Sequence, residues 1–328
     1  MIPITVIGAG PAGSAAAISA ALEGASVDLR ERSRFPRHKV CGEFVSPEIL
    51  PLLSKLGVER SFLDAAPARV RRLELHFGAR TRSAALPEPA FGLSRYVFDQ
   101  LLLDRALAAG VALSERTVKP PAAPTILAHG RQIRSGLAKG DRIFGFKAHY
   151  EGPASDAIEL HFFEGGYVGV NAIEAGRTNI CGLANEAFLK RIGFEYDELV
   201  HRVPSLNARV RPLRRAMDWL STGPLVFANQ FETAPQEGVY PAGDALSFVD
   251  PFTGSGMYCA ALTGTIAGLS AARQISAQEH LDRCRQALGR PFRFASLIRK
   301  AVASGLAARL APLVPSSLLY RLTRPAPV

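Results

Sequence analysis

The hydrophobic pattern divides the start of the chain into three short elements. Residues 2–7 form an apolar run, 11–23 are rich in alanine, and 25–31 return to a strand-like pattern. A strand, a helix and a second strand so close together form a βαβ unit, whose strands are parallel and buried on both faces. The sequence therefore predicts an α/β domain here.

Two amphipathic helices are predicted further along. The segment 46–56 has Ser46 at the N-cap position and Gly57 directly after its end. The segment 96–109 has apolar residues at helical spacing and is followed by Gly110.

The middle of the chain is rich in strand-like segments. Residues 70–77 alternate, and four further runs follow between 144 and 183. Because no helical pattern separates these four runs, we expect an antiparallel sheet. Residues 239–242 then form a predicted strand, and 256–275 a predicted helix.

The patterns together predict an α/β protein with an α+β part: a Rossmann-like domain, a second domain with an antiparallel sheet, and a helical tail. The chain has 328 residues, 48% of them hydrophobic, which is enough for a sizeable core. The expected boundaries are 1–75, 92–143 and 225–275 for the first domain, 76–91 and 144–224 for the second, and 276–328 for the tail.

The positive charge is concentrated in the tail. The formal net charge is +10, but residues 281–328 hold nine Lys or Arg against one acid, Asp282, which leaves +8 there and +2 in residues 1–280. No nucleic-acid-binding motif accompanies the charge, so we expect no nucleic-acid partner. The tail has two interpretations: a solvated basic face on a packed helix, or peripheral contact with an anionic membrane.

The four cysteines are widely spaced and form no CxxC pair and no metal-type cluster with histidine. This is typical of reduced thiols, and we expect no metal site. No basic region precedes the first strand, and no apolar run is long enough to cross a bilayer. The expected location is cytoplasmic, with membrane association as the alternative.

The first motif that carries chemistry is GAGPAG, in which Gly8, Gly10 and Gly13 have the G-x-G-x-x-G spacing between strand and helix. The glycines permit a tight turn, and the N–H groups at the helix start hold a pyrophosphate. Glu31 ends the second strand, 23 residues after Gly8, where an acid binds ribose hydroxyls. A dinucleotide site is therefore predicted.

A second glycine loop lies far along the chain. Gly243 and Asp244 follow the strand at 239–242, and Gly254-Ser255-Gly256 opens a helix. An acid at this place can hold a polyol hydroxyl, and a helix N-terminus stabilises charge on a flavin ring. Two helix starts, one for pyrophosphate and one for the ring, favour FAD over NAD.

Three further segments accompany the glycine loop and Glu31: RHKVCGE at 37–43, LSRYVFDQLL at 93–102 and GDALSFVDPFTGSGM at 243–257. With them, the sequence resembles the geranylgeranyl reductase-like branch of the para-hydroxybenzoate hydroxylase superfamily. The resemblance covers most of residues 1–275. It implies an FAD-dependent oxidoreductase of the kind that includes monooxygenases. It also implies NADPH or NADH as a transiently docked electron donor, since no second dinucleotide motif is present.

The resemblance assigns residues to the cofactor. It puts Arg37 and Arg95 near the phosphates or adenosine, although Arg95 also fits an ordinary arginine at a helix start. The implied cofactor-binding residues are Gly8, Gly10, Pro11, Ala12, Gly13, Glu31, Arg32, Arg37, Cys41, Gly42, Arg95, Gly243, Asp244, Pro251, Gly254, Ser255, Gly256 and Met257.

The sequence departs from the branch in three places. His129 stands where the branch has an aspartate, the segment 117–128 is shorter than usual, and Gly169 stands where an aromatic residue is expected. The single tryptophan, Trp219, excludes the Trp-rich motif of flavin halogenases.

Four residues are candidates for proton donors or substrate-orienting groups: Cys41, Glu43, His149 and Tyr167. Cys41 also fits a small buried hydrophobe, and His149 an ordinary residue on a sheet face. The expected substrate is a hydrophobic small molecule, such as a polyketide- or isoprenoid-type metabolite of secondary metabolism. Oxygenation or oxidation is the leading prediction, because the aromatic residue is missing. Reduction of C=C bonds in isoprenoid-like chains is the alternative.

Overall fold

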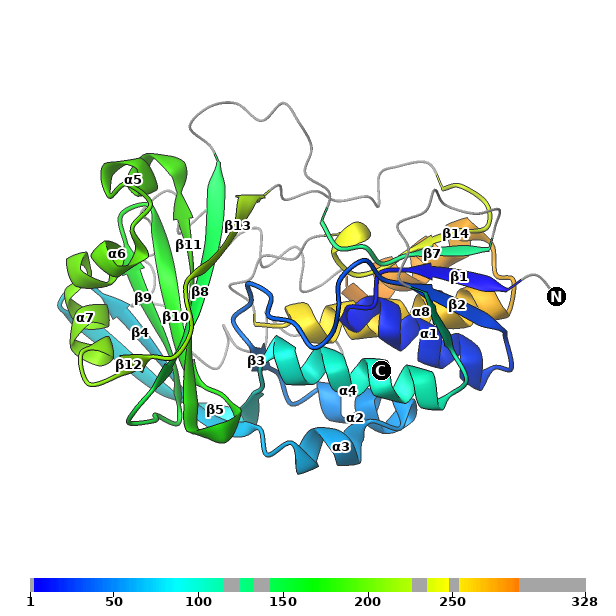
Figure 1. Cartoon of the computed structure of the whole chain (residues 1–328), viewed down its shortest axis with the longest axis horizontal. Helices are drawn as coiled ribbons and strands as arrows, with labels where there is room; N and C mark the ends of the chain where they lie inside the picture. The colour runs from blue at the N-terminus through cyan, green and yellow to red at the C-terminus, as the bar shows by residue number, and fades with distance from the viewer. Residues whose placement is uncertain (1–2, 115–123, 132–141, 226–234, 248–253, 289–328) are drawn as a thin grey trace.

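The computed structural model describes residues 3–114, 124–131, 142–225, 235–247 and 254–288 (Figure 1). Two sheets dominate these residues, one of five and one of nine strands. We call them the parallel sheet and the large sheet. Figure 1 shows them at opposite ends of the molecule.

The parallel sheet has the order β14-β7-β1-β2-β6, and every neighbouring pair in it is parallel. Its helices lie together on one side of the strands in Figure 1. The strands are β1 (Ile4–Ile7), β2 (Val27–Arg30), β6 (Ala112–Ser114), β7 (Thr125–Leu127) and β14 (Val239–Pro241), and the helices are α1 (Pro11–Leu22), α2 (Ile49–Leu56), α3 (Glu59–Asp64), α4 (Arg95–Ala108) and α8 (Gly256–Ala272).

Helices α1 and α8 are in direct backbone contact. A Cβ on Gly264 would lie 2.0 Å from the Ala12 oxygen, and one on Gly268 would lie 2.3 Å from the Ala16 oxygen. Only glycine permits this approach. Gly264 lies beside Ala12 and Gly268 beside Ala16, so the two helices run in the same direction. Gly264 comes eight residues after the first residue of α8, and Ala12 comes one residue after the first residue of α1. At 1.5 Å per residue, α8 therefore begins roughly 10 Å before α1. The start of α8 therefore extends towards the large sheet.

The large sheet has the order β12-β8-β11-β10-β9-β4-β5-β3, with β13 also paired to β8. Its pairs are antiparallel except for β4 with β9, which is parallel. Residues 68–75, which the sequence assigned to the first domain, belong to this sheet as part of β4. The strands are β3 (Phe44–Val45), β4 (Ala68–Phe77), β5 (Arg80–Gly92), β8 (Ile143–Glu151), β9 (Ala157–Phe163), β10 (Gly166–Ala172), β11 (Arg177–Asn185), β12 (Arg214–Arg215) and β13 (Leu220–Leu225).

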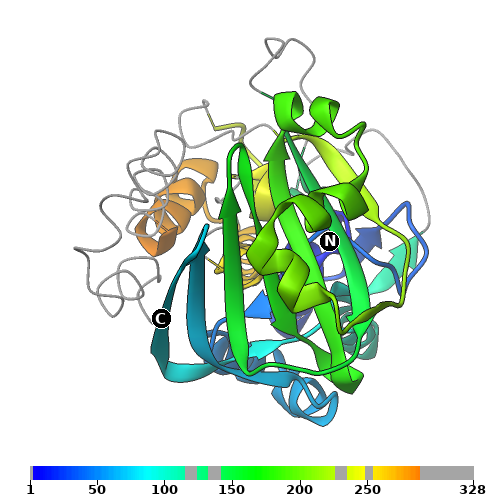
Figure 2. The same ribbon diagram turned by 90° about the vertical axis from the view of Figure 1, so that its left-hand side faces the viewer.

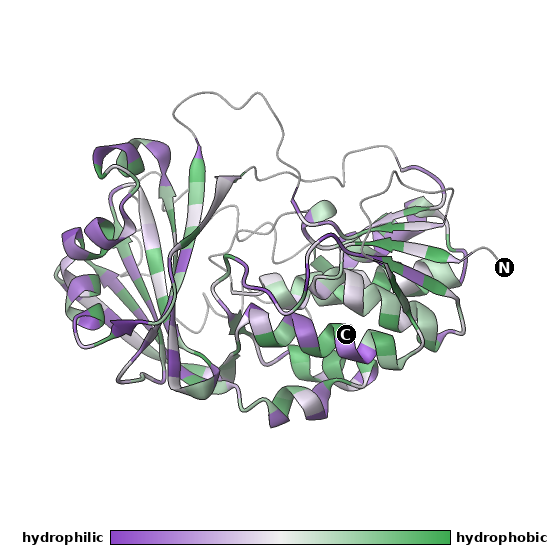
Figure 3. Ribbon diagram, viewed as in Figure 1, coloured by the Kyte–Doolittle hydropathy of each residue, from purple (hydrophilic) through white to green (hydrophobic). Residues whose placement is uncertain are grey.

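The two faces of the large sheet have different partners. Figure 2 shows one face covered by α5 (Glu186–Arg191), α6 (Tyr196–Arg202) and α7 (Pro204–Val210). Phe146 and Val170 point to that side and join its core. We call the opposite face, which is turned towards the parallel sheet, the open face. In Figure 3, hydrophobic residues run along α1 and α8, while α5–α7 are largely hydrophilic.

The predicted fold class is confirmed: a Rossmann-like parallel sheet and a mostly antiparallel sheet are both present. One predicted helix boundary differs from the structure. Helix α2 begins at Ile49 and not at Ser46, although Gly57 ends it in the left-handed conformation, at φ +70°. Residues 277–288 of the predicted tail are helical, and 289–328 lie outside the described residues. None of the helices in the described ranges is long and apolar enough to cross a membrane.

Candidate functional site

The glycine-rich loop leaves β1 and enters α1, as predicted. Gly8 has φ +98°, and a Cβ on it would lie 2.5 Å from the Ala128 oxygen. A Cβ on Gly13 would lie only 1.6 Å from the Gly8 oxygen. These two glycines are required by the turn itself, since any side chain would strike the backbone.

Three other predicted glycines border open space. Among the described residues, a Cβ on Gly10 would meet only the Arg95 Nη2 atom, at 3.7 Å, and a Cβ on Gly42 or Gly256 would meet nothing within 4 Å. None of the three has a positive φ. Within the described residues, no side chain caps the N-terminus of α1 or of α8. Two helix starts with uncapped N–H groups and side-chain-free approaches form a cradle that suits an extended anionic cofactor.

Glu31 is directed at the glycine loop. Its Oε2 accepts a hydrogen bond from the Ala9 N–H at 2.9 Å, and its Oε1 accepts one from the Ser33 N–H at 2.8 Å. Burial acts to raise the pKa of Glu31, but these backbone donors and Arg37 hold it below its usual value. The carboxylate therefore stays ionised and fixes the loop, a role that the motif alone did not predict.

Arg37 and Arg95 converge on Asp99, which is fully buried in α4. The Arg95 guanidinium binds it through two bonds of 2.5 and 2.7 Å, and Arg37 lies 3.3 Å from it and 3.5 Å from Glu31. Asp99 raises the pKa of Arg95 although burial opposes the charge. Because Arg95 also borders Gly10, the cluster places guanidinium N–H donors beside the cradle, with their charge balanced by Asp99 and Glu31.

Glu43 is the centre of a fully buried charge cluster. Its Oε1 accepts bonds from the Lys147 ammonium and, at 2.7 Å, from the Arg95 N–H, and its Oε2 lies 2.7 Å from Nε2 of His149. Glu43 and Lys147 are both 0% exposed. Although burial acts to raise it, His149 and Lys147 hold the pKa of Glu43 below its usual value. Thus His149 is not a solitary sheet-face residue; it belongs to a cluster that joins the 37–43 segment to β8.

Cys41 and Gly42 lie against the large sheet. The Asn179 amide donates to the Cys41 oxygen at 3.2 Å and to the Gly42 oxygen at 2.9 Å. Burial raises the pKa of the Cys41 thiol. A protonated thiol is a poor nucleophile, so the raised pKa favours a packing role for the partly buried Cys41 over a chemical one.

The second glycine loop is described in part. Gly243 has φ +58°, and its N–H donates to Thr263 at 2.9 Å. Asp244 lies at the surface, 3.7 Å from Arg131. Gly254 is held at φ +64° beside Phe44. Of the other predicted residues, Ser255 and Met257 are buried and Arg32 is exposed. Pro251 lies outside the described residues.

Tyr167 is separate from the charge cluster. It lies on the open face in β10, two strands from β8, and packs near Phe162. Half-buried apolar side chains surround it on this face. The set comprises Leu73, Leu75, Ile158, Leu160, Phe162 and Leu183. Gly169 is among them, and a Cβ on it would meet Leu160 at 3.4 Å, the Cys181 oxygen at 3.5 Å and Ile158 at 4.0 Å.

Three partners in the site were missed by sequence reasoning: Asp99, Lys147 and Asn179. Asp99 stands four residues after Arg95 on one helix, the spacing of an ion pair. Lys147 is two residues from His149 in an otherwise apolar strand, so both lie on one face. No local pattern points to Asn179, because its contacts come from residues 138 positions away.

The chain has relatives among characterised proteins, although no family model matches it. It is 26% identical over 340 residues to digeranylgeranylglycerophospholipid reductase 2 of Methanopyrus kandleri, covering 89% of this chain and 84% of that protein. It is also 38% identical over 86 residues to menaquinone reductase of Mycolicibacterium smegmatis, a match that spans only 20% of that protein's length.

Solved structures share the fold over nearly the whole chain. The flavin-dependent brominase Bmp2 aligns with a TM-score of 0.76 and 18% identity, covering 98% of this chain and 92% of the brominase. The flavoprotein/dehydrogenase from Cytophaga hutchinsonii aligns with a TM-score of 0.77 and 16% identity, covering 98% and 91%. The myxobacterial chondrochloren halogenase CndH aligns with a TM-score of 0.74 and 21% identity, covering 90% of this chain and 81% of the halogenase.

These comparisons confirm the resemblance that the motifs indicated. The structural neighbours are flavoproteins with the same two-sheet architecture, and the relative with the longest aligned stretch among those named above is a geranylgeranyl-type reductase. The chain shares its fold with these flavin-dependent brominase, flavoprotein/dehydrogenase and halogenase structures.

Proposed function

We propose that this protein is an FAD-dependent oxidoreductase that acts on a hydrophobic small molecule. The observation that carries the proposal is the pair of helix starts: among the described residues no side chain caps α1 or α8, and Gly10 and Gly256 at these starts carry no side chain. Gly10, Ala12 and Gly13 would hold the pyrophosphate, and Gly256 and Met257 would border the ring. When bound, FAD supplies the electron transfer, which no amino-acid side chain in the site can provide.

The chain's own residues orient the cofactor and the substrate. Arg37 and Arg95 would offer guanidinium N–H donors to the phosphates, and Asp99 fixes both guanidinium groups. The Glu43–Lys147–His149 cluster holds the 37–43 segment against the sheet and excludes water there. The apolar side chains around Tyr167 would contact the substrate, with Gly169 leaving room for its bulk.

Two reactions fit this arrangement. Oxygenation or oxidation of the substrate is the first, supported by the absence of a side chain at Gly169, where an aromatic residue is expected. Reduction of a C=C bond in an isoprenoid-like chain is the second. It is supported by the relative named as a digeranylgeranylglycerophospholipid reductase, which aligns over 89% of this chain. NADPH or NADH would reduce the flavin in either case.

An anaerobic experiment separates the two reactions. The flavin is reduced with light or dithionite, and a geranylgeranyl substrate is added without oxygen. Reoxidation of the flavin with loss of one C=C bond identifies a reductase. A flavin that stays reduced until oxygen is admitted, with the substrate then gaining an oxygen atom, identifies an oxygenase.

The cofactor itself is tested first. Purified protein should bind FAD and show its visible absorbance, and Gly10→Ala should weaken FAD binding at least tenfold, or about 1.4 kcal/mol. Gly169→Ala is the matched control. As at Gly10, the added methyl group makes only ordinary van der Waals contacts, but it lies on the large sheet and should leave FAD binding unchanged. A protein that stays colourless with excess FAD refutes the proposal.

Contact with a membrane surface is also proposed for the basic C-terminal segment. Residues 289–328 carry seven Lys or Arg and no acid, whereas in the described part, residues 277–288, the exposed Arg283 and Arg285 pair with Glu279 and Asp282. Co-sedimentation with anionic but not neutral vesicles tests this contact.

A further inference from the structure

Two strands of the large sheet carry the same four residues, Glu-Leu-His-Phe, once in β4 and once in β9. Because β4 and β9 pair in parallel and in register, Glu74 is opposite Glu159 and His76 is opposite His161. Opposite residues share a face. The repeat therefore places two histidines and two glutamates together on the face that α5–α7 cover.

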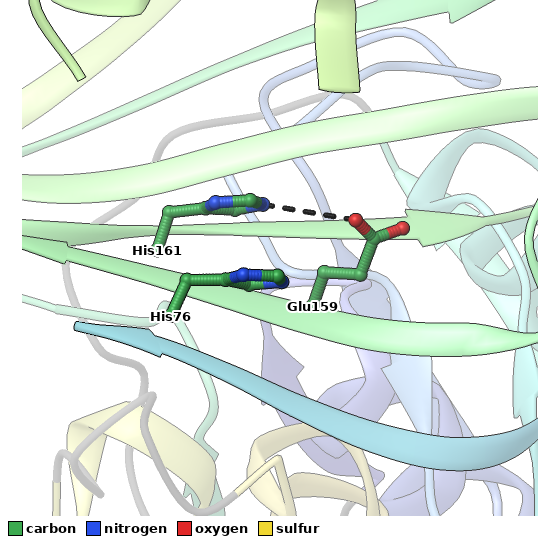
Figure 4. A group of neighbouring side chains, drawn as sticks. All are labelled: His76, Glu159 and His161. Carbon is green, nitrogen blue, oxygen red and sulfur yellow. Dashed lines mark ion pairs between the residues drawn. The ribbon is translucent and has the colours of Figure 1, made fainter. Parts of the chain in front are cut away.

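The two imidazole rings are stacked (Figure 4). Their centroids are 4.3 Å apart and their planes differ by 4°. Nε2 of His161 lies 3.7 Å from Oε2 of Glu159, and Nε2 of His76 lies 3.7 Å from Oε2 of Glu74. The ligand atoms of His76, Glu159 and His161 all lie within 4.8 Å of one another. The two Nε2 atoms therefore approach carboxylate oxygens without forming hydrogen bonds.

The other ring nitrogens are already engaged. Nδ1 of His76 lies 2.9 Å from the Thr81 hydroxyl, and Nδ1 of His161 lies 2.9 Å from the Ser205 hydroxyl. A hydroxyl can accept a hydrogen bond, so each Nδ1 can carry the proton and leave Nε2 as a lone pair. Both Nε2 atoms are buried and, within the described residues, have no hydrogen-bond partner. His161 is 0% exposed.

A buried lone pair that faces a carboxylate oxygen is unfavourable, because both groups are acceptors. A cation between them removes this conflict. Imidazole nitrogen and carboxylate oxygen are the donors that divalent transition metals such as Zn²⁺ prefer, and metal-bound histidines usually donate their other N–H to a neighbour. The Thr81 and Ser205 hydroxyls would serve as those neighbours.

We propose that Nε2 of His76, Nε2 of His161 and Oε2 of Glu159 bind a divalent transition metal ion such as Zn²⁺. At bond lengths of about 2.0–2.1 Å, tetrahedral ligand atoms lie about 3.3 Å apart, so these side chains must close by roughly 1.5 Å. The two rings, whose planes now differ by 4°, would also have to turn so that their Nε2 lone pairs converge on the ion. A water molecule would take the fourth position. The ion would be structural, since it joins β4 to β9, which pair in parallel within the large sheet.

An ion pair with Arg209 is another explanation for the burial of Glu159. Arg209 donates to Oε1 of Glu159 at 2.7 Å, and this contact compensates part of the carboxylate charge. Oε2 still faces His161 and is available to a metal. The Arg209 contact accounts for neither the paired histidines nor their two unpartnered nitrogens.

The experiment uses tag-free full-length protein that has been dialysed against EDTA. Zn²⁺ is added in competition with a chromogenic chelator, and we expect one tightly bound ion per chain. His161→Gln and His76→Gln should each weaken binding at least tenfold, because each removes one ligand. His201→Gln is the matched control, since His201 is exposed on α6 and outside the cluster, and it should bind as the parent does.

Bound Co²⁺ gives a second readout, through the visible bands of a tetrahedral site in the parent that both cluster variants lose. Should His161→Gln fail to fold by circular dichroism, His76→Gln decides alone, because His76 is nearer the surface, with a side chain 13% exposed. FAD content should be the same in all variants, so this result is independent of the proposed function. Absence of tight zinc binding in the parent, or equal binding in all variants, overturns the proposal.

Discussion

Replacing Glu43 by glutamine tests whether the buried cluster holds the 37–43 segment to the large sheet. Glutamine keeps the shape and can still accept from the Arg95 N–H, but it carries no charge to compensate Lys147. Both Glu43 and Lys147 are 0% exposed, so the ammonium cannot recover its hydration without local opening.

The expected loss can be worked from the contact. Two unit charges about 4 Å apart in a protein of effective dielectric constant about 20 attract by about 4 kcal/mol. Removing one partner of a buried pair typically costs about 3–5 kcal/mol, because an uncompensated charge remains. We therefore expect Glu43→Gln to lower the free energy of unfolding by about 3–5 kcal/mol.

The assay is urea denaturation followed by tryptophan fluorescence, with Glu43→Gln/Lys147→Met as the second variant. Removing both charges should restore at least half of the lost stability. Because the pKa of Glu43 is held below its usual value, the parent's advantage should be full above about pH 4.3 and decline as the pH falls further. The reasoning is refuted if Glu43→Gln costs less than about 1 kcal/mol, or if the double variant is no more stable than the single one.

Three further substitutions or reactions test the other parts of the site. Gly13→Ala should abolish both FAD binding and stable folding, because its methyl group would lie 1.6 Å from the Gly8 oxygen; a soluble, FAD-bound variant in size-exclusion chromatography contradicts this. Gly169→Leu should leave the bound flavin spectrum unchanged but raise KM for a long apolar substrate at least tenfold; an unchanged KM would mean that the substrate binds elsewhere. Cys41 should react with iodoacetamide at pH 8 at least tenfold more slowly than glutathione, measured by mass spectrometry, because burial raises its pKa; equal rates would show an accessible thiolate.

Local sequence was sufficient for the nucleotide-binding half of the fold. The strand, glycine loop and helix at residues 4–22 are adjacent in the chain, and their geometry follows from short-range sterics. Gly8 and Gly13 were predicted because only glycine fits where the backbone folds onto itself. The predicted start of α2 was wrong, since Ser46 is a good cap in isolation but the chain turns through residues 47 and 48 before the helix begins.

Only the tertiary structure decided which polar residues meet. Lys147 and Glu43 are 104 positions apart, and the ion pair exists because β8 lies beside the 37–43 segment. His76 and His161 meet because β4 pairs in parallel with β9, whereas the alternating pattern is compatible with either direction. The sequence determined the glycine loops and the alternation of each strand, which depend on neighbouring residues. Strand order and direction were decided by long-range packing, and with them the charged clusters between strands.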